Sequence, residues 1–283
     1  MCGIGAIMNS GTIYTDMKTL LSGQKSRGGS STGMAGWING HINLCRALVS
    51  PDKFDLNNKK IVPLITGTNP RMLIGHNRAP STGDVTLANA HPFISCNGDW
   101  MLVHNGMSRN AVPVGEILKL RGHTILGTTD TEPLLHIWEE ILIHAGGDSD
   151  KAIKEYYAFI DKVISASFAI ILMHKDDMMY VLREGNPAVI FEKDNTVYVA
   201  SEEDAIKDFG GKGSKYSELN RGTIAKITPE RGVEIMVGSV DERTVGSHKV
   251  YYNDYYQQRN GVDGDYNMRW QGGGALDSFR FND

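Results

Sequence analysis

The sequence is poor in three features that would each have indicated a class of protein: cysteine, long apolar runs and an excess of positive charge. Three of its 283 residues are cysteines, Cys2, Cys45 and Cys96, and an odd count without metal-type spacing argues against a disulfide framework and against a zinc site. Lys and Arg number 29 against 33 Asp and Glu, a net charge of -4, so there is no global basic field to attract a nucleic-acid backbone. We therefore expect no metal and no nucleic-acid partner.

Long apolar runs are missing, and so is a targeting segment. The longest apolar run, residues 168–173, is far shorter than the roughly 18 residues that a membrane-spanning helix needs. No positively charged segment followed by an apolar one, the pattern of a secretory signal, opens the sequence. With 41% hydrophobic and 22% charged residues, the composition is typical of a folded globular protein. We expect no membrane contact and a cytoplasmic location.

Short strand-like runs alternate with a few amphipathic stretches up to about residue 240, without a long linker or a repeat. Strands are predicted at residues 3–8, 33–38, 41–48, 72–77, 100–104, 168–174, 178–183, 188–192 and 196–200. Helices are predicted at residues 16–25, 114–120, 130–145, 151–164 and 202–208. Thr129 and Glu132 predict a capping box at the start of the third helix. The pattern favours stacked layers, sheet against sheet with helices outside, or an α+β arrangement.

Cys2 is the cysteine with a chemical interpretation, whereas Cys45 and Cys96 lie in strand-like stretches and are expected to be buried small hydrophobic residues. Removal of Met1 would leave Cys2 as the N-terminal residue, with a thiol and an α-amine on one residue. The unperturbed pKa of such an amine is about 7.7 to 8.0, so the amine can act as the general base for its own thiol. A second-position cysteine alone is weak evidence, and the specific signal comes from the motifs further along the chain.

Six short motifs occur in a fixed order along the chain. They are residues 1–5 (MCGIG), 27–33 (RGGSSTG), 75–83 (GHNRAPSTG), 89–93 (NAHPF), 104–106 (HNG) and 129–132 (TDTE). Each motif alone is common, but the ordered set resembles the glutaminase domain of class II glutamine amidotransferases, most closely the glucosamine-6-phosphate synthase and phosphoribosylpyrophosphate amidotransferase types. The resemblance implies an α+β fold of the N-terminal nucleophile hydrolase kind, a four-layer αββα sandwich of two antiparallel sheets. It assigns residues 2–245 to this domain and leaves residues 246–283 as a Tyr-, Gly- and Asn-rich tail, which we interpret as a loosely ordered segment or a docking arm.

A glutamine site needs a cationic fork and an anion, because the substrate carries an α-carboxylate and an α-ammonium group besides its amide. Arg78 can bind a carboxylate with two parallel hydrogen bonds, as Lys cannot, and the resemblance implies that it holds the α-carboxylate. The resemblance implies that Asp130 receives the α-ammonium group. The alternative interpretations are a surface ion pair for Arg78 and a favourable helix-start charge for Asp130.

The resemblance implies a role for four more residues. Asn105, through its side-chain amide, and Gly106, through its backbone N–H, are the candidates for the oxyanion hole, and the alternative is an Asn-Gly hairpin turn. Ser81 is a candidate for substrate contact and His91 for a supporting role in the pocket. The family usually carries Asp where this chain has Ser30, and often an aromatic residue where it has Ala79, so the pocket wall or its closing loop is expected to differ.

The implied reaction is hydrolysis of L-glutamine to glutamate and ammonia through a thioester on Cys2, without a metal or an organic cofactor. In the resembling enzymes a second domain consumes the ammonia, but only about 40 residues follow this domain, and residues 210–213 (GGKG) lack the spacing and the preceding strand of a phosphate loop. We therefore expect a stand-alone amidotransferase that supplies ammonia to an acceptor site on another chain, either a synthase subunit or a homo-oligomer. A self-sufficient glutaminase or γ-glutamyl amidohydrolase and a non-catalytic binding subunit stay open as alternatives.

Overall fold

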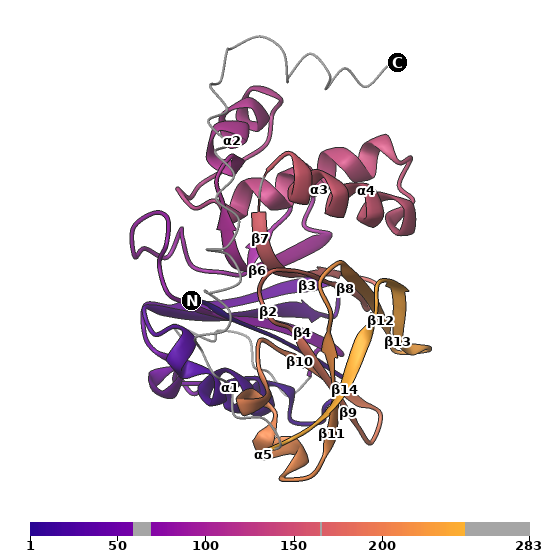
Figure 1. The fold of residues 1–283 in the computed structure, drawn as a ribbon. Coiled ribbons are helices and arrows are strands. Elements are labelled where there is room, and N and C mark those ends of the chain that lie inside the picture. The colour runs from indigo at the N-terminus through magenta and orange to yellow at the C-terminus, as the bar shows by residue number, and fades with distance from the viewer. Residues whose placement is uncertain (59–68, 165, 247–283) are drawn as a thin grey trace, which may run out of the picture. The chain divides into compact units, whose positions relative to one another are not determined.

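The computed structural model describes residues 1–58, 69–164 and 166–246 (Figure 1). Contacts divide the chain into residues 1–245 and 246–283, and the helices and strands of the described ranges all lie in the first of these units. The α-helices are α1 (Ile13–Gly23), α2 (Ala111–Leu120), α3 (Thr131–His144), α4 (Ser149–Lys162) and α5 (Lys207–Gly210). Three short 3-10 turns are η1 (Lys25–Arg27), η2 (Pro51–Lys53) and η3 (Glu203–Ala205).

The strands form two sheets in which every pairing of neighbours is antiparallel. The eight-stranded sheet has the order β14 (Val240–Thr244), β11 (Lys215–Leu219), β9 (Val189–Lys193), β10 (Thr196–Ala200), β1 (Gly3–Met8), β4 (Met72–Arg78), β2 (Ser31–Ile38) and β3 (His41–Ala47). The six-stranded sheet has the order β13 (Gly232–Val237), β12 (Thr223–Thr228), β8 (Met178–Glu184), β7 (Ala166–His174), β6 (Trp100–Ser108) and β5 (Phe93–Ile94). β1 thus lies inside its sheet, between β10 and β4.

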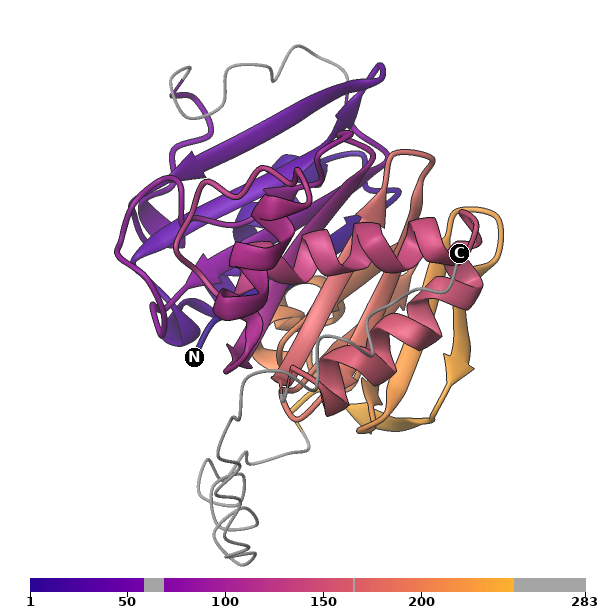
Figure 2. The same ribbon diagram turned by 90° about the horizontal axis from the view of Figure 1, so that it is seen from above.

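Side-chain alternation along the strands divides the interior into three cores. Alternate residues of β1 (Ile4, Ala6 and Met8) pack against Met101 and Val103 of β6, so the two sheets face each other across an apolar layer. On the outer face of the eight-stranded sheet lies a second core that includes α1. A third core joins the outer face of the six-stranded sheet to α2, α3 and α4, and Figure 2 shows α3 and α4 lying over these strands.

The layers are therefore helix, sheet, sheet, helix, with α2, α3 and α4 on one side and α1 and α5 on the other (Figure 1). This confirms the expected α+β four-layer sandwich of two antiparallel sheets. All nine predicted strands are present, two with the predicted bounds and the others with shifts of one to four residues at an end. The short β5 and the strands β11 to β14 were not predicted. Of these, β13 and β14 are largely exposed at sheet edges and show no long apolar alternation that would indicate a strand.

The start of α3 differs from the predicted capping box. The backbone N–H of Glu132 donates to Thr129 Oγ1 at 3.4 Å, as expected. The Glu132 carboxylate does not return to Thr129, however, and instead accepts the backbone N–H groups of Leu126 (3.1 Å) and Gly127 (2.6 Å). It therefore orders the loop that precedes the helix.

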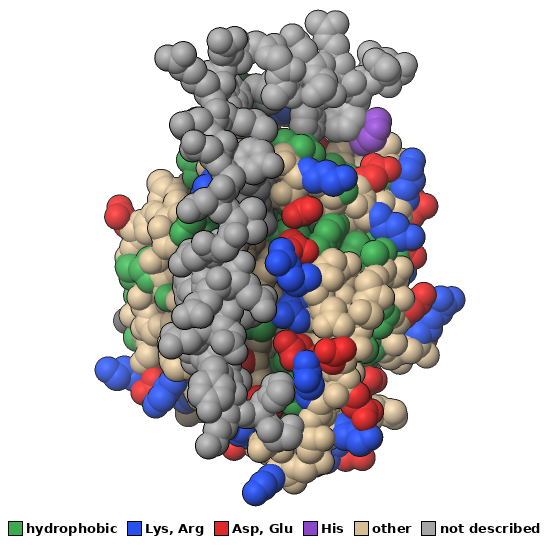
Figure 3. All heavy atoms as spheres, in the orientation of Figure 1, with side chains coloured by type: hydrophobic (Ala, Val, Ile, Leu, Met, Phe, Trp, Pro, Cys, Tyr) green, Lys and Arg blue, Asp and Glu red, His purple; other side chains and the backbone are tan. Residues whose placement is uncertain are grey.

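The surface drawn in Figure 3 mixes both signs of charge, with Lys and Arg side chains next to Asp and Glu side chains. Within the described ranges, none of the helices combines the length and the apolar character needed to cross a membrane. The predicted Tyr-rich tail lies outside the described residues, apart from its first residue, Gly246.

Two leucines on helices provide a matched test of the packing. Leu20 of α1 is fully buried, whereas Leu120 at the end of α2 is 89% exposed. Leu20→Ala should lower the free energy of unfolding by about 2 to 5 kcal/mol, because it removes buried methyl groups and leaves a cavity. Leu120→Ala should change it by less than about 0.5 kcal/mol. Urea unfolding followed by circular dichroism measures both, and equal losses in the two variants would contradict this packing of α1.

Candidate active site

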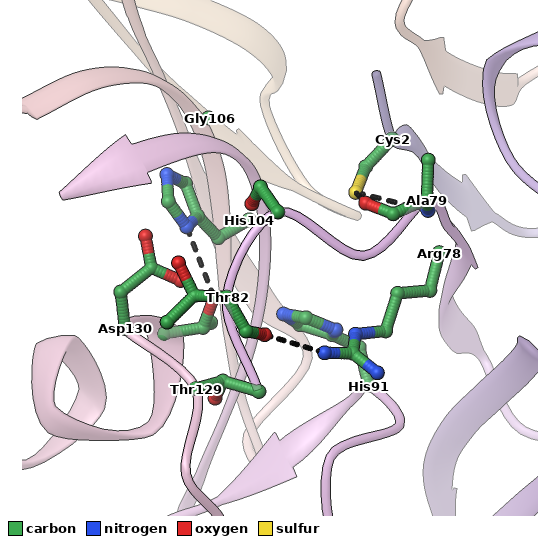
Figure 4. A pocket seen from close by; sticks show the side chains of 11 residues that line it. Cys2, Arg78, Ala79, Thr82, His91, His104, Gly106, Thr129 and Asp130 are labelled. Carbon is green, nitrogen blue, oxygen red and sulfur yellow. Dashed lines mark hydrogen bonds between the residues drawn. The ribbon is translucent and has the colours of Figure 1, made fainter. Parts of the chain in front are cut away.

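A pocket opens where the start of β1, the end of β4, β6 and the start of α3 meet (Figure 4). It is lined by Cys2, Arg78, Ala79, Ser81, Thr82, His91, His104, Gly106, Thr129, Asp130 and Thr131. Six of the seven predicted site residues, spread over about 130 positions of sequence, therefore line one pocket. Asn105, the seventh, does not line it.

Cys2 lies at the end of the pocket next to Ala79. Its Sγ is 3.4 Å from both the backbone O and the backbone N of Ala79, and the residue is 9% exposed. Burial raises the pKa of the Cys2 thiol above its ordinary value, and the hydrogen bond with Ala79 offsets part of this rise. The resting sulfur is therefore a thiol, and it needs a base before it can act as a nucleophile.

Two buried side chains fix the chain around Cys2. Arg27 donates from Nε to the backbone O of Cys2 at 2.9 Å and pairs with Glu202 at 3.0 Å. Gln24 donates to the backbone O of Ile4 at 2.8 Å and accepts from the backbone N of Ser201 at 3.2 Å. These bonds tie the first residues of β1 to the turn after β10. Neither Arg27 nor Gln24 was predicted as a site residue, although Arg27 opens the RGGSSTG motif.

Arg78, the last residue of β4, is 2% exposed and so is not a surface ion pair. Its guanidinium group donates to the backbone O atoms of Thr82 (2.6 Å), Gly83 (3.1 Å) and Asp84 (2.8 Å). Burial lowers the pKa of Arg78. Carbonyl groups satisfy its N–H donors without neutralising the positive charge, so the site retains an attraction for an anion.

Asp130 lies on the opposite side of the pocket, directly before α3. Its Oδ2 accepts the backbone N–H of Ser108 at 2.7 Å, and the residue is 5% exposed. The side chain makes no capping bond to α3, so its carboxylate is held by β6. The pocket therefore has a buried cation on one side and a buried anion on the other, with the Cys2 sulfur next to Ala79 (Figure 4).

Asn105 and Gly106 lie within β6, opposite Ala169 and Phe168 of β7, and do not form the hairpin turn that was the alternative. A Cβ atom at Gly106 would lie 1.9 Å from the backbone O of Ser167, so only glycine fits. The side-chain Nδ2 of Asn105 is buried and has no hydrogen-bond partner among the described residues. An unsatisfied buried donor is costly, which is typical of a group that gains its partner when a ligand binds.

Three buried histidines lie at the pocket: His91 and His104 line it, and His76 packs against His91. His91 stacks on His76 with ring centroids 3.9 Å apart, and neither of its ring nitrogens has a partner in the described part of the chain. His76 Nε2 lies 3.0 Å from the backbone O of His104, and His104 Nδ1 lies 3.0 Å from Thr131 Oγ1. Burial lowers the pKa of all three, that of His76 to about 3. The rings are neutral at pH 7 and act as packing and hydrogen-bonding groups.

The two departures from the family pattern are the side chains of Ser30 and Ala79. The contacts that both residues make near the site use backbone atoms. Ala79 meets Cys2 through its backbone N and O, and the backbone N of Ser30 donates to the backbone O of Arg78 at 3.0 Å. The expected difference of the pocket wall stays a prediction. Thr82, Thr129 and Thr131 also line the pocket but are not among the seven predicted site residues; Thr82 lies within the GHNRAPSTG motif and the other two within the TDTE motif.

Comparison with known proteins identifies the family of the chain. The family model described as "Glutamine amidotransferase domain" matches residues 64–227. The glutamine–fructose-6-phosphate aminotransferase (isomerizing) of Aeropyrum pernix is 34% identical over 167 residues, which are 58% of this chain and 26% of that protein. The enzyme of the same name from Zymomonas mobilis is 30% identical over 247 residues, 87% of this chain and 38% of that protein.

A solved structure shares the fold. The glutamine phosphoribosylpyrophosphate amidotransferase from B. subtilis superposes with a TM-score of 0.68 over 85% of this chain and 50% of that chain, at 21% identity. The fold is that of the N-terminal nucleophile hydrolases. This chain belongs to the class II glutamine amidotransferase family, and it spans 26% and 38% of the length of the two curated relatives named above.

Because burial lowers the pKa of three histidines, we predict that the folded protein loses stability below pH 6.5. His76 stays neutral in the folded protein down to pH about 3, whereas in the unfolded chain a histidine takes up a proton below about pH 6.5. Because the unfolded state then binds more protons, the free energy of unfolding falls with decreasing pH, by about 1.4 kcal/mol per pH unit for His76 alone once the pH is well below 6.5. His91 and His104 contribute with the same sign.

Urea unfolding at pH 7.5, 6.0 and 5.0 measures this dependence above the range in which most carboxylates titrate. Between pH 6.0 and 5.0, His76→Gln should lose about 1 kcal/mol less than the unmodified protein. His41→Gln, at an exposed position of β3, serves as the matched control and should keep the original slope. An unchanged slope in His76→Gln would show that His76 is not held neutral by burial.

Proposed function

We propose that this chain hydrolyses the side-chain amide of L-glutamine to glutamate and ammonia, with Cys2 as the nucleophile. One observation carries the proposal: the Cys2 thiol lines the same pocket as a buried guanidinium, Arg78, and a buried carboxylate, Asp130. An amino acid presents a carboxylate and an ammonium group on one carbon, which is the charge pattern that this pair complements. The family of the chain supports the same reaction.

The nucleophile is activated by its own α-amine once Met1 is removed. With Met1 attached, the nitrogen of Cys2 is an amide and cannot accept a proton. A free amine accepts the thiol proton, and the thiolate attacks the amide carbon of glutamine. The proton is then delivered to the departing ammonia, leaving a glutamyl thioester that water hydrolyses to glutamate. The raised pKa of the buried Cys2 thiol agrees with the need for this base, because the sulfur keeps its proton until a base takes it.

Substrate recognition is assigned to the two charged residues and their surroundings. Arg78 binds the α-carboxylate with its guanidinium fork, in competition with the carbonyl groups of residues 82–84, and Asp130 binds the α-ammonium group. Ser81 is exposed at the rim of the pocket, where its hydroxyl is available to the substrate. His91 supports the pocket floor through its stacking on His76.

The oxyanion of the tetrahedral intermediate is assigned to Asn105 and Gly106. The unpartnered Nδ2 of Asn105 supports this role; the residue does not line the pocket, so its side chain would have to turn toward the substrate. The close approach of Gly106 to β7, which excludes a side chain there, supports a backbone N–H as the second donor. Such donors contribute about 100- to 1000-fold each in rate.

The ammonia produced is proposed to serve an acceptor site on another chain or in a homo-oligomer, and a cytoplasmic location fits this role. The amidotransferase domain is assigned to residues 2–245, and residues 246–283 are proposed as a separate tail. The names of the curated relatives describe transfer to fructose 6-phosphate, but this chain spans 26% of the first of them. Hydrolysis with water as sole acceptor is the alternative that the same pocket supports.

Glutamate release from L-glutamine by the purified protein tests the reaction. Cys2→Ala should lower the rate by about 1000-fold or more, because it removes the nucleophile. Cys45→Ala, at the other buried cysteine, should leave the rate unchanged. Intact mass of the same samples reports whether Met1 is absent. Turnover that survives in Cys2→Ala would rule out the thioester route.

Recognition of the α-carboxylate is tested by Arg78→Lys, with Arg71→Lys as the matched control. Arg71 precedes the same strand but is exposed. Lys keeps the charge and loses the fork, so Arg78→Lys should raise KM for glutamine by about 10- to 100-fold and change kcat much less. Arg71→Lys should change neither constant. An unaltered KM in Arg78→Lys would remove Arg78 from the substrate site.

A further inference from the structure

A second cluster of reactive side chains lies outside the glutamine pocket. Cys96 belongs to the turn between β5 and β6, His123 to the loop between α2 and α3, and His136 and Glu139 to successive turns of α3. One ligand atom from each of the four lies within 4.8 Å of all the others. Cys96 is exposed, which corrects the expectation of a buried strand cysteine.

The distances within this cluster resemble those around a tetrahedral zinc ion. An ion about 2.3 Å from a thiolate and about 2.0 to 2.1 Å from a ring nitrogen sets these two atoms about 3.6 Å apart. Cys96 Sγ lies 3.5 Å from His123 Nδ1 and 3.6 Å from His136 Nδ1. A nitrogen and a carboxylate oxygen on the same ion lie about 3.3 Å apart, and His123 Nδ1 is 3.4 Å from Glu139 Oε2.

One pair is closer than an ion would hold it. His136 Nδ1 lies 2.6 Å from Glu139 Oε2, within hydrogen-bond distance. A metal between them would widen this pair by about 0.7 Å. The thiol proton of Cys96 would pass to solvent, and the ring proton of His136 would reside on Nε2.

The surroundings of the cluster orient its members. His123 Nε2 lies 2.9 Å from Glu140 Oε1, and Glu140 is in turn paired with Arg121 at 2.5 Å. A carboxylate on the distal nitrogen fixes the ring so that Nδ1 points at the cluster, as metal-binding histidines are usually held. The second oxygen of Glu139 accepts the backbone N–H of Cys96 at 2.8 Å. The side chains of His123 and Glu139 are each 10% exposed.

We propose that Cys96, His123, His136 and Glu139 bind one zinc ion as a structural site. The mixture of thiolate, imidazole and carboxylate donors suits zinc, and four protein donors leave no open position for a substrate. The ion joins the β5–β6 turn and the α2–α3 loop to α3. Since His136 follows Asp130 by six residues, about 9 Å along a helix, the site steadies the helix that begins beside the glutamine pocket.

Zinc binding by the purified Cys2→Ala protein tests the site, because that background excludes the catalytic thiol. Zn²⁺ alone is titrated in competition with a chromophoric chelator, after prior metal removal, and Co²⁺ serves as the spectroscopic probe. One equivalent of zinc per chain is expected, and the cobalt form should show the intense visible bands of a tetrahedral ion with a thiolate charge-transfer band. At a 100-fold excess over Kd, zinc should raise Tm by about 5 to 10 °C.

Matched variants locate the ion. Cys96→Ala and His123→Ala should weaken zinc binding at least about 100-fold, and Cys96→Ala should abolish the charge-transfer band. Cys45→Ala and His41→Ala, a cysteine and a histidine away from the cluster, should bind as before. Circular dichroism of each variant verifies that it is folded. Because Cys96 is exposed, we expect Cys96→Ala to fold. Absence of a bound equivalent in the Cys2→Ala protein, or binding and bands that persist in folded Cys96→Ala, would overturn the proposal whatever the glutaminase assay shows.

Discussion

The antiparallel pairing of β1 with β4 is the constraint on which the rest of the site depends. In this register Gly3 lies opposite Asn77, so the residue that precedes β1 meets the residues that end β4. Cys2 is thereby brought to Ala79 across 76 intervening positions of sequence, and into the same pocket as Arg78. A shift of the register by one residue would turn every side chain of β1 to the other face. The shift is unfavourable because it would remove Ile4 from the apolar layer between the sheets.

The second sheet forms another wall of the pocket through β6. β6 faces β1 through the inter-sheet core, and its far end carries Gly106 and Ser108, the latter holding Asp130 at the start of α3. Pocket walls built from strand ends are rigid, because their backbone groups are already paired inside sheets. The buried, neutral histidines pack at the pocket without adding charge near Arg78. This arrangement makes the fold sensitive to acid, since unfolding would let these rings take up protons.

The two clusters of the chain use α3 in different ways. Its start presents Asp130 and Thr131 to the glutamine pocket, and its next two turns present His136 and Glu139 to Cys96 and His123. The two clusters therefore lie on one helix, and a metal bound at the second would not contact the substrate of the first.

The sequence by itself determined the long strands, the clear helices and most of the pocket, because alternation and the ordered motifs are local patterns that are visible in the sequence alone. Cys2, Arg78 and Asp130 were identifiable from residue chemistry together with the family resemblance. The edge strands β13 and β14, the bonds of Arg27 and Gln24 around Cys2, and the unpartnered Asn105 amide were decided by the tertiary structure alone. So was the cluster at Cys96, whose members are separated by 26, 12 and 2 residues. Such spacing carries no metal-binding pattern, since the donors come together only when a turn and a loop from separate parts of the chain pack against one helix.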